Sequence, residues 1–526
     1  MQARALGCLV LLCLALSSSG VVNAQAQGTA ADDAAQVADG VTENPHAPGD
    51  TADSPEAHAA AAEDAHADHG GHGAMGKDMP VWAVIPFAAL LLCIAILPLV
   101  SPHWWEHNSS KALVVALLAI PLAAYLLITQ GAAGQHEIVD KLKEYLSFIL
   151  LLGALYVISG GVFVQGSLSG TPLANTGLLA LGAVIANFIG TTGASVLLIR
   201  PLLRANQSRQ RKVHIVVFFI FIVSNCGGLL TPLGDPPLFL GFLKGVPFEW
   251  TLMNLWPQWL TVNFALLVIF HIWDQLVFGR EERERAGSQL EQVLQHEPVR
   301  INGMLNFVFL AGVVVTIYAS GRGLGNHGNP WPYGIQEGIM AILAVVAYLT
   351  TAASNRNSNR FTFGPIIEVA VLFIGIFITM APALLILNSW GKGEREVLGM
   401  DFGLSGPGQF FWATGILSSF LDNAPTYLTL AATACGLMEV NAEGPRYMKD
   451  FLEQGGEPAR QLLAAISAGA VFMGANTYIG NGPNFMVKAI AEENGVKMPS
   501  FFGYMAYSCG VLIPLFVVIT LIFFRG

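Results

Sequence analysis

Two short segments of the chain share one pattern of small, polar and proline residues inside otherwise apolar stretches. The pattern is Thr-x-[Leu/Ile]-Gly-[Asp/Asn]-x-Pro, and it occurs at residues 231–237 and again at residues 477–483. Glycine and proline interrupt a helix, and an interrupted helix is tolerated at membrane depth only where it is packed in protein or lines a cavity. Corresponding interruptions in two halves of one chain indicate the binding site of a secondary transporter.

The first pattern supplies a carboxylate, Asp235, between Gly234 and two prolines. An ionised carboxylate inside the bilayer is costly unless it meets water, a cation or a partner, so such a residue is a functional candidate. The prolines lack N–H groups and leave nearby carbonyl oxygens without helical donors. Together these oxygens form a hard site that suits a sodium ion or a proton. The structural alternative is that Asp235 only caps the half-helix that follows it.

Two further apolar segments, at about 172–203 and 407–437, are each interrupted near the middle by polar and small residues. A polar tip between two half-length apolar arms predicts a re-entrant hairpin, and a pair of kinked spanning helices is the alternative. The second tip contains Asp422 and Asn423, which are a second ion-binding candidate or a plain helix N-cap. The remaining candidates for ion or substrate binding lie at the tips and beside the breaks: Asn187, Thr191, Thr192, Asn225, Thr231, Gly234, Thr426, Asn476, Thr477, Gly480, Asn481 and Asn484.

Three other acidic residues fall in apolar segments but close to their predicted ends. We interpret Glu337, Glu368 and Asp274 as residues of the membrane interface. Glu368 is also the alternative candidate for a proton carrier.

The composition predicts an all-α polytopic membrane protein around these residues. The chain is 53% hydrophobic and 12% charged, which is about half the charged fraction of a typical soluble domain. Several apolar runs reach the length of about 20 residues that a spanning helix needs. We expect spans at roughly 80–101, 112–130, 145–166, 213–243, 251–278, 303–319, 334–352, 362–388, 460–493 and 500–524.

The charged loops predict the orientation of these spans. Basic residues crowd three loops, near residues 204–212, 280–300 and 356–360. The positive-inside rule places these loops in the cytoplasm. The spans then alternate correctly only if hairpin 172–203 enters from the cytoplasm and hairpin 407–437 from outside. We therefore predict an inverted repeat, with units at about 172–243 and 407–493. Three basic residues disagree with the positive-inside rule in this orientation, because they lie on the outer side of the membrane: Arg446, Lys449 and Arg460.

The N-terminal part precedes the transporter domain, which we expect at residues 80–526. Residues 1–24 resemble a secretory signal peptide, and an uncleaved signal anchor is the alternative. Residues 25–79 lack the apolar periodicity of a core, and we expect a disordered periplasmic tail. Its histidines suggest either a solvated tail or weak metal capture. The four clustered ones are His58, His66, His69 and His72.

Several other classes of function lack their sequence signatures. The chain has no P-loop, dinucleotide fingerprint, His-Glu-x-x-His or Gly-x-Ser-x-Gly motif, so we expect neither an enzyme nor a cofactor. Nothing resembles a basic nucleic-acid-binding surface. The six cysteines lie in or beside apolar segments and do not indicate a disulfide framework.

Two segments of the chain resemble the sequence signatures of a known superfamily. Segments 224–237 and 474–484 resemble the paired signatures of the ion transporter superfamily, and the nearest branches are NhaD-type sodium/proton antiporters and proteins assigned to citrate transport. The resemblance covers about residues 80–526. It implies an inverted-repeat fold with two re-entrant hairpins and two broken helices, a homodimer, and an elevator motion.

The resemblance also implies where ions bind. The family ion sites correspond to Asn187–Thr192 with Asn225–Asp235, and to Asp422–Thr426 with Asn476–Asn484. The dicarboxylate branch has a Ser-Asn-Thr triplet at each hairpin tip, and neither tip here has it. The expected function is therefore sodium/proton antiport in the bacterial inner membrane, with sodium bound at Asp235 and Asp422. The alternative is an ion-coupled carrier of citrate or a dicarboxylate anion.

Overall fold

The structure, a computed structural model, describes residues 79–526 except 168, 285–296, 328, 330, 395, 397–402, 443–445 and 526. The predicted signal peptide and histidine-containing tail lie outside the described residues. The first half contains 3₁₀ helix η1 (Val81–Val84), α3 (Ile85–Val100), α4 (Pro102–Trp105), α5 (Asn108–Ser159), β1 (Phe163–Ser167), α6 (Pro172–Ala205), α7 (Val213–Ile222), η2 (Cys226–Leu229), α8 (Pro236–Leu243) and α9 (Trp250–Glu284).

The second half repeats the use of long and broken helices. It contains β2 (Glu297–Asn302), α11 (Leu305–Gly321), α12 (Ile335–Thr350), α13 (Ala353–Ser358), α14 (Gly364–Gly391), α15 (Pro407–Phe420), α16 (Asn423–Leu437), α17 (Tyr447–Met473), η3 (Gly474–Asn476), α18 (Gly482–Glu493) and α19 (Phe501–Phe523). The prediction of an all-α membrane protein is confirmed.

The first re-entrant hairpin is α6. Its helical path is broken at Gly190, whose φ of 76° is accessible to glycine at little cost. The two ends of α6 return to the same place, because the side-chain amides of Asn175 and Asn206 donate hydrogen bonds to each other at 3.0 and 2.7 Å. The arms therefore run side by side, as the interrupted apolar pattern predicts.

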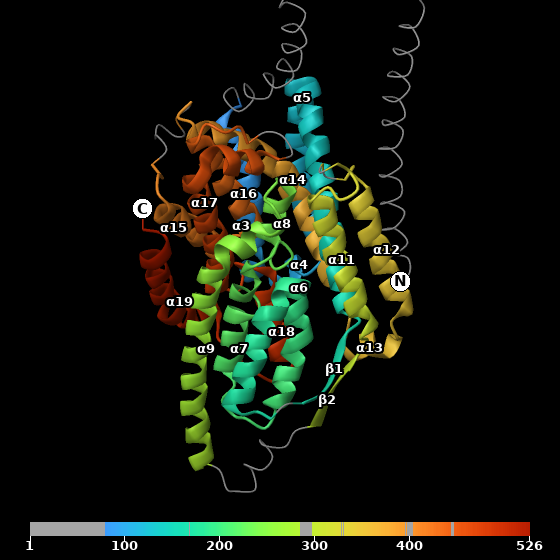
Figure 1. Cartoon of the computed structure of the whole chain (residues 1–526), viewed down its shortest axis with the longest axis vertical. Coiled ribbons are helices and arrows are strands. Elements are labelled where there is room, and N and C mark those ends of the chain that lie inside the picture. Colours follow the sequence, from blue (N-terminus) through green and yellow to red (C-terminus); the bar gives the residue numbers. More distant parts are fainter. Residues whose placement is uncertain are drawn as a thin grey trace, which may run out of the picture.

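The second hairpin consists of α15 and α16, which are joined by extended backbone at Leu421 and Asp422. The α15 arm packs along α17, with Gly415 against Met473 and Gly469 against Phe411. Both arms lie in the upper half of the view in Figure 1, whereas α6 extends into the lower half. The two hairpins thus enter the molecule from opposite ends.

The broken spans that follow the hairpins also run in opposite directions (Figure 1). Helix α7 lies in the lower half and α8 continues above it, whereas α17 lies in the upper half and α18 below it. Between the half-helices, each chain passes through a short 3₁₀ turn, η2 or η3, and an extended loop. The predicted inverted repeat of hairpins and broken helices is confirmed.

The predicted span 145–166 is wrong at its C-terminal end. Segments 112–130 and 145–159 both belong to α5, which runs from Asn108 to Ser159 with a break at Gly131 (φ 54°). Residues 163–167 then form β1, which pairs antiparallel with β2. The apolar run of α5 continues through Phe163 and Val164 into β1, so hydropathy alone does not show where the helix ends.

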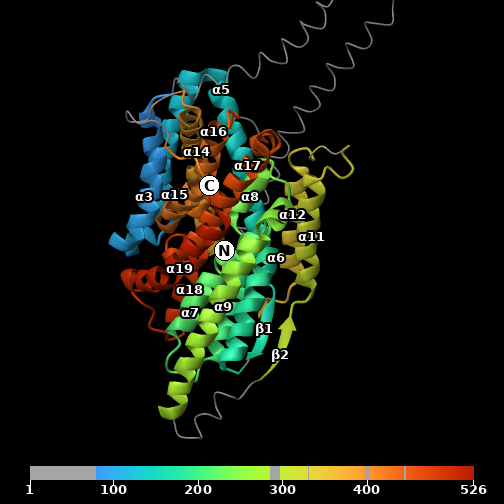
Figure 2. The same cartoon turned by 60° about the vertical axis from the view of Figure 1, so that its left-hand side comes forward.

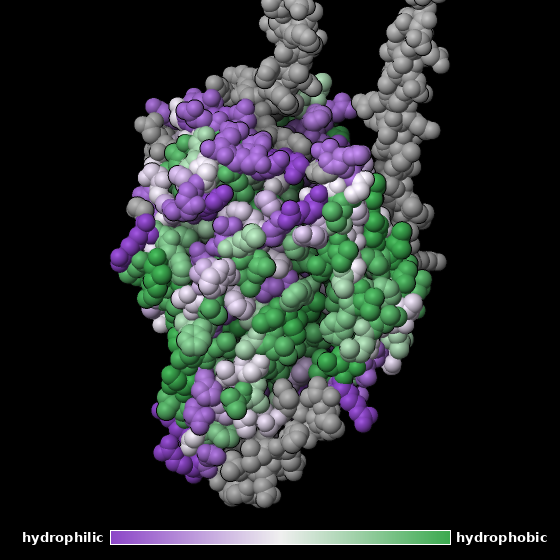
Figure 3. Space-filling view, in the orientation of Figure 1, coloured by the Kyte–Doolittle hydropathy of each residue, from purple (hydrophilic) through white to green (hydrophobic). Residues whose placement is uncertain are grey.

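The exterior is that of a multi-pass membrane protein. Among the described residues, six helices are long and apolar enough to cross a bilayer. Hydrophobic side chains cover the middle of the face in Figure 3, and hydrophilic ones gather toward both ends. Helix α7, by contrast, is buried from His214 to Ile222. In Figure 2 it lies among α9, α18 and α19, so the broken helices are surrounded by protein.

The inverted repeat predicts that the loop after α6 and the start of α17, before its break at Gly456, lie on opposite sides of the membrane. We expect Gln207→Cys to react with a membrane-impermeant thiol reagent only from the cytoplasm, and Gln454→Cys only from outside. Both side chains are exposed. The measurement is labelling of intact cells and inverted vesicles in a variant that lacks the native cysteines. Labelling of both positions from one side would contradict the predicted topology.

Candidate ion-binding site

The Asp235 carboxylate lies at the centre of the candidate site and is 1% exposed. Its Oδ1 accepts hydrogen bonds from Thr191 Oγ1 at 2.8 Å and Asn481 Nδ2 at 3.1 Å. Its Oδ2 accepts one from Asn423 Nδ2 at 2.5 Å. These donors come from the first hairpin, the second broken span and the second hairpin, so three distant segments meet on one carboxylate.

Asp235 occupies the N-cap position of α8, but its side chain makes no capping hydrogen bond. The next two residues are prolines, which have no N–H to offer. The backbone carbonyl of Asp235 accepts from Leu238 N at 3.1 Å instead. The interpretation of Asp235 as a simple helix cap therefore disagrees with the geometry.

The hairpin tips approach Asp235 through the same contact in both repeats. Thr231 Oγ1 donates to the carbonyl of Asn187 at 2.5 Å, and Thr477 Oγ1 donates to the carbonyl of Ser419 at 2.5 Å. The two donors that reach Asp235, Thr191 and Asn423, each lie four residues after these carbonyls. The pseudo-symmetry of the repeat therefore places one tip residue on each oxygen of the carboxylate.

A set of asparagines joins the two broken spans. Asn225 Nδ2 donates to Asn484 Oδ1 at 2.7 Å, and Asn481 Nδ2 lies 3.2 Å from Asn225 Oδ1. Asn484 Nδ2 in turn donates to the carbonyls of Gly474 and Thr477 at 2.8 and 2.9 Å. All three asparagines are buried. They satisfy the carbonyl groups that the helix breaks expose, as buried polar backbone requires.

Close glycine contacts set the shape of both breaks. A Cβ on Gly234 would lie 2.1 Å from the Gly228 carbonyl oxygen, and a Cβ on Gly480 would lie 2.6 Å from that of Gly474. The first loop is also bound to the hairpin tip, because Thr191 N donates to the Gly234 carbonyl at 2.8 Å. The glycines of the sequence pattern are therefore required by backbone approach.

Asp422 is placed differently from Asp235. Its Oδ1 accepts from Ala424 N at 3.1 Å, and it is the N-cap of α16. Thr426 Oγ1 donates to its backbone carbonyl at 2.9 Å. The structure thus shows Asp422 as an N-cap. It directly precedes Asn423, the residue of this tip that contacts Asp235.

The other predicted site residues are near this cluster without touching the carboxylate. Asn187 braces the first break, since its Nδ2 donates to the Gly227 carbonyl at 2.7 Å. Asn476 Nδ2 donates to Ser419 Oγ at 2.9 Å. Thr192 lines a cavity of about 70 Å³ between the first hairpin tip, α8, α5 and α14. This volume is sufficient for a few water molecules or a small ion.

The electrostatics of the site combine one acid with neutral dipoles. None of the described residues that hydrogen-bond to the Asp235 carboxylate is cationic. Four half-helices begin close to it, namely α8, α16, α18 and the returning arm of α6, and helix N-termini favour negative charge. Two amide oxygens, Asn423 Oδ1 and Asn476 Oδ1, are buried without a hydrogen-bond partner within the described part of the chain. The site therefore offers oxygen ligands to a cation.

The three other membrane acids are engaged elsewhere. Glu368 forms an ion pair with Lys111 at 2.9 Å and is 45% exposed. Glu337 accepts from Ser147 Oγ at 2.6 Å and from Gly334 N at 2.9 Å, and is buried at the start of α12. Each of these two carboxylates therefore has a partner within the protein, away from Asp235.

Asp274, which we interpreted as a residue of the membrane interface, has its side chain fully buried within the protein. It contacts Arg209 at 2.6 Å and His214 at 2.9 Å, and Asn175 Nδ2 donates to it at 3.0 Å. Arg209, which we counted among the cytoplasmic charges, is also buried, since Asp274 and Glu281 both pair with it. This cluster ties both ends of the first hairpin to α7 and α9, and its members are too far apart in sequence to be recognised as a group.

Comparison with known families decides the class of the protein. Residues 76–524 match the family described as "Putative citrate transport". The chain belongs to this family. Membership makes it a membrane transporter of an ion or a carboxylate, in agreement with the broken helices and the buried site. A comparison with curated proteins gave no match.

The glycine contacts yield a prediction of stability. Gly234→Ala places a methyl group against a backbone carbonyl that cannot rotate away, and we expect a loss of about 3 kcal/mol in the free energy of unfolding. Gly177→Ala is the matched control, because a Cβ there meets open space. Thermal unfolding of the purified proteins in detergent compares them. Equal apparent melting temperatures would show that the loops do not depend on this approach.

Proposed function

We propose that this transporter exchanges sodium for protons at Asp235. The observation that supports the proposal is a buried carboxylate with three neutral donors and no cationic partner among them. An uncompensated carboxylate at this depth favours a cation or a proton. Because one carboxylate holds only one of them at a time, competition between sodium and a proton is sufficient to couple their movements.

Each neighbouring residue has a part in this mechanism. Thr191 and Asn423 hold the two carboxylate oxygens from opposite hairpins, while Asn481 contacts Oδ1. The unpaired Asn423 Oδ1 is available as a further ligand to sodium. Asp422 is the second carboxylate of the proposed site; one of its oxygens caps α16 by accepting from Ala424 N at 3.1 Å, and we assign the other to ion binding at the tip. The asparagines Asn225 and Asn484 keep the loops in register.

We also propose the assembly and location that the superfamily resemblance implies. The protein works in the bacterial inner membrane as a homodimer, with its N-terminal tail in the periplasm. The broken helices and hairpins shift as one body relative to the rest of the chain, as the superfamily resemblance implies. No cofactor takes part, and the energy comes from the ion gradient.

A carrier of citrate or a dicarboxylate is the second candidate, because the family description names citrate. Four half-helix N-termini close to Asp235 also favour an anion. A tricarboxylate would, however, have to approach a site in which none of the groups bonded to Asp235 is cationic. We therefore place sodium/proton exchange first.

Asp235→Asn retains shape and hydrogen-bonding capacity but removes the titrating charge. We expect normal insertion into the membrane and sodium-driven proton flux reduced to background. Asp235→Glu should retain part of the flux with altered sodium affinity, because the charge remains but moves. Proton flux in vesicles is measured beside the amount of folded protein.

Glu457→Gln is the control, since it removes a carboxylate whose ion pair with Arg460 is exposed, with the two side chains 67% and 54% exposed. This variant should exchange sodium at close to the normal rate. Full exchange by Asp235→Asn would contradict the mechanism and direct attention to Asp422. Citrate uptake by the unmodified protein without sodium/proton exchange would favour the second candidate.

A further inference from the structure

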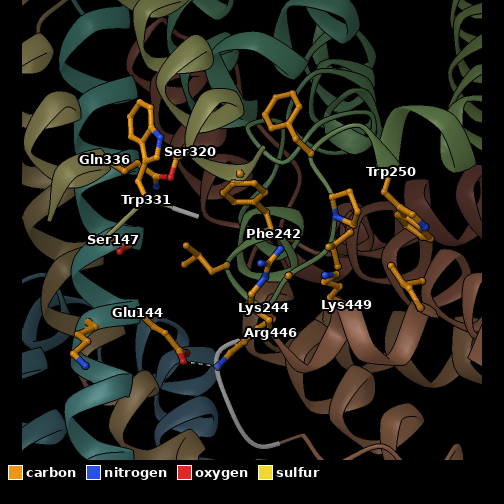
Figure 4. Close-up of a pocket in the computed structure, with 18 of the residues that line it drawn as sticks. Glu144, Ser147, Phe242, Lys244, Trp250, Ser320, Trp331, Gln336, Arg446 and Lys449 are labelled. Carbon is orange, nitrogen blue, oxygen red and sulfur yellow. Dashed lines mark hydrogen bonds and ion pairs between the residues drawn. The ribbon is translucent and has the colours of Figure 1, made fainter. Parts of the chain in front are cut away.

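A large cleft opens at the end of the molecule where α8 and α17 meet α5 and α12. It has a volume of about 1080 Å³. Figure 4 shows Glu144, Ser147 and Gln336 on one wall, and Lys244 and Arg446 on the other. The lining includes the C-terminal end of α8 but not Asp235 at its N-terminal end. The cleft therefore ends short of the candidate ion site.

One buried ion pair crosses this cleft. Lys244 Nζ bonds to Glu144 Oε1, and the side chains are 3% and 16% exposed. Lys141 lies beside them, 3.4 Å from Glu137 and 3.6 Å from Glu144. Two cations and two carboxylates thus form a balanced cluster in which Lys244 is the member that comes from the opposite wall (Figure 4).

Lys244 belongs to the wall that carries the ion site. Helix α8 has Asp235 as its N-cap and Lys244 as its C-cap, so one short rigid helix connects them. The Lys244 carbonyl accepts from Met448 N of α17 at 3.0 Å. Gly241 of α8 lies directly against Tyr427 of the second hairpin. A movement of Asp235 with its hairpin would therefore carry Lys244 along.

Glu144 belongs to the opposite wall. Near it on α5, Tyr145 Oη donates to the Ala370 carbonyl of α14 at 2.9 Å, and Ser147 donates to Glu337 of α12 at 2.6 Å. Helix α5 is thus fixed to α12 and to the first half of α14. The other end of α14 is bound to the second hairpin, because Asn388 Nδ2 donates to the Ala432 carbonyl at 3.0 Å. We therefore assign α5 and α12 to one body and α8, α16 and α17 to the other, with the ion pair between them.

We propose that the Lys244–Glu144 ion pair is a latch that opens and closes in each transport cycle. The inference rests on the proposed function, because it assigns the latch to the movement that exposes Asp235. A buried ion pair adds little net stability, yet leaving one partner alone is costly. When the walls part, water in the cleft hydrates both charges, so the pair can separate and form again.

The latch is tested by removing and then exchanging its charges. Lys244→Gln removes the bond between the walls and leaves Glu144 paired only with Lys141 of its own helix, whereas Glu144→Gln leaves the buried Lys244 without its partner. In both variants we expect the exchange rate per folded molecule to fall about tenfold or more. Equilibrium sodium binding to the purified variants should change less than about twofold, since the contacts of Asp235 are untouched. The double variant Lys244→Glu with Glu144→Lys should recover most of the rate.

Lys449→Gln and Glu453→Gln are matched controls in the same cleft. That pair is separated by 3.5 Å, and its side chains are 42% and 63% exposed, so its removal should change the rate less than about twofold. The latch is contradicted if the single variants exchange at the normal rate per folded molecule, if sodium binding falls with the rate, or if the exchanged double variant fails to recover.

A failure of the proposed function gives a different result. In that case the unmodified protein would exchange no sodium for protons. The same three variants then test the latch on citrate uptake, with the same expected loss and recovery.

Discussion

The structure depends on the need to keep one carboxylate in a place without bulk water. Asp235 is buried, and its two oxygens are held by one hydroxyl and two amide groups. Neutral donors stabilise the carboxylate only in part, so in the proposed mechanism a cation can still bind to it and dissociate. A permanent lysine or arginine partner would remove this freedom, because the carboxylate would then be neutralised in every state.

The inverted repeat explains how neutral donors from three segments reach a carboxylate on a fourth. Each hairpin brings a tip to the middle of the molecule from its own end, and each broken span supplies an extended loop to meet it. The matching contacts of Thr231 and Thr477 show that both halves use one geometry. The halves differ at the equivalent positions 235 and 481, where one has aspartate and the other asparagine. Of the two positions that the repeat makes equivalent, only Asp235 therefore carries a charge.

Much of this arrangement could be predicted from the sequence, because its causes are local. The polar and small residues around Gly190 and the Gly-Asp-Pro-Pro run at 234–237 mark breaks that are visible in the sequence itself, and apolar arms on both sides predict the hairpins. Long-range contacts left no such signal. The pairing of Asp274 with Arg209 and the bridge from Lys244 to Glu144 join residues from separate helices. Only the packing of those helices brings them together. The strand β1 was missed because the apolar run of α5 continues into its first two residues, Phe163 and Val164, and hydropathy alone does not mark the end of the helix.

The central claim is that sodium and a proton compete for one carboxylate. The most direct test is the number of protons released when sodium binds to the purified protein in a weakly buffered solution near neutral pH. The account predicts release from the unmodified protein, an apparent sodium affinity that weakens as the pH falls, and no release from Asp235→Asn. Sodium binding of full affinity that releases no proton at any pH would contradict it.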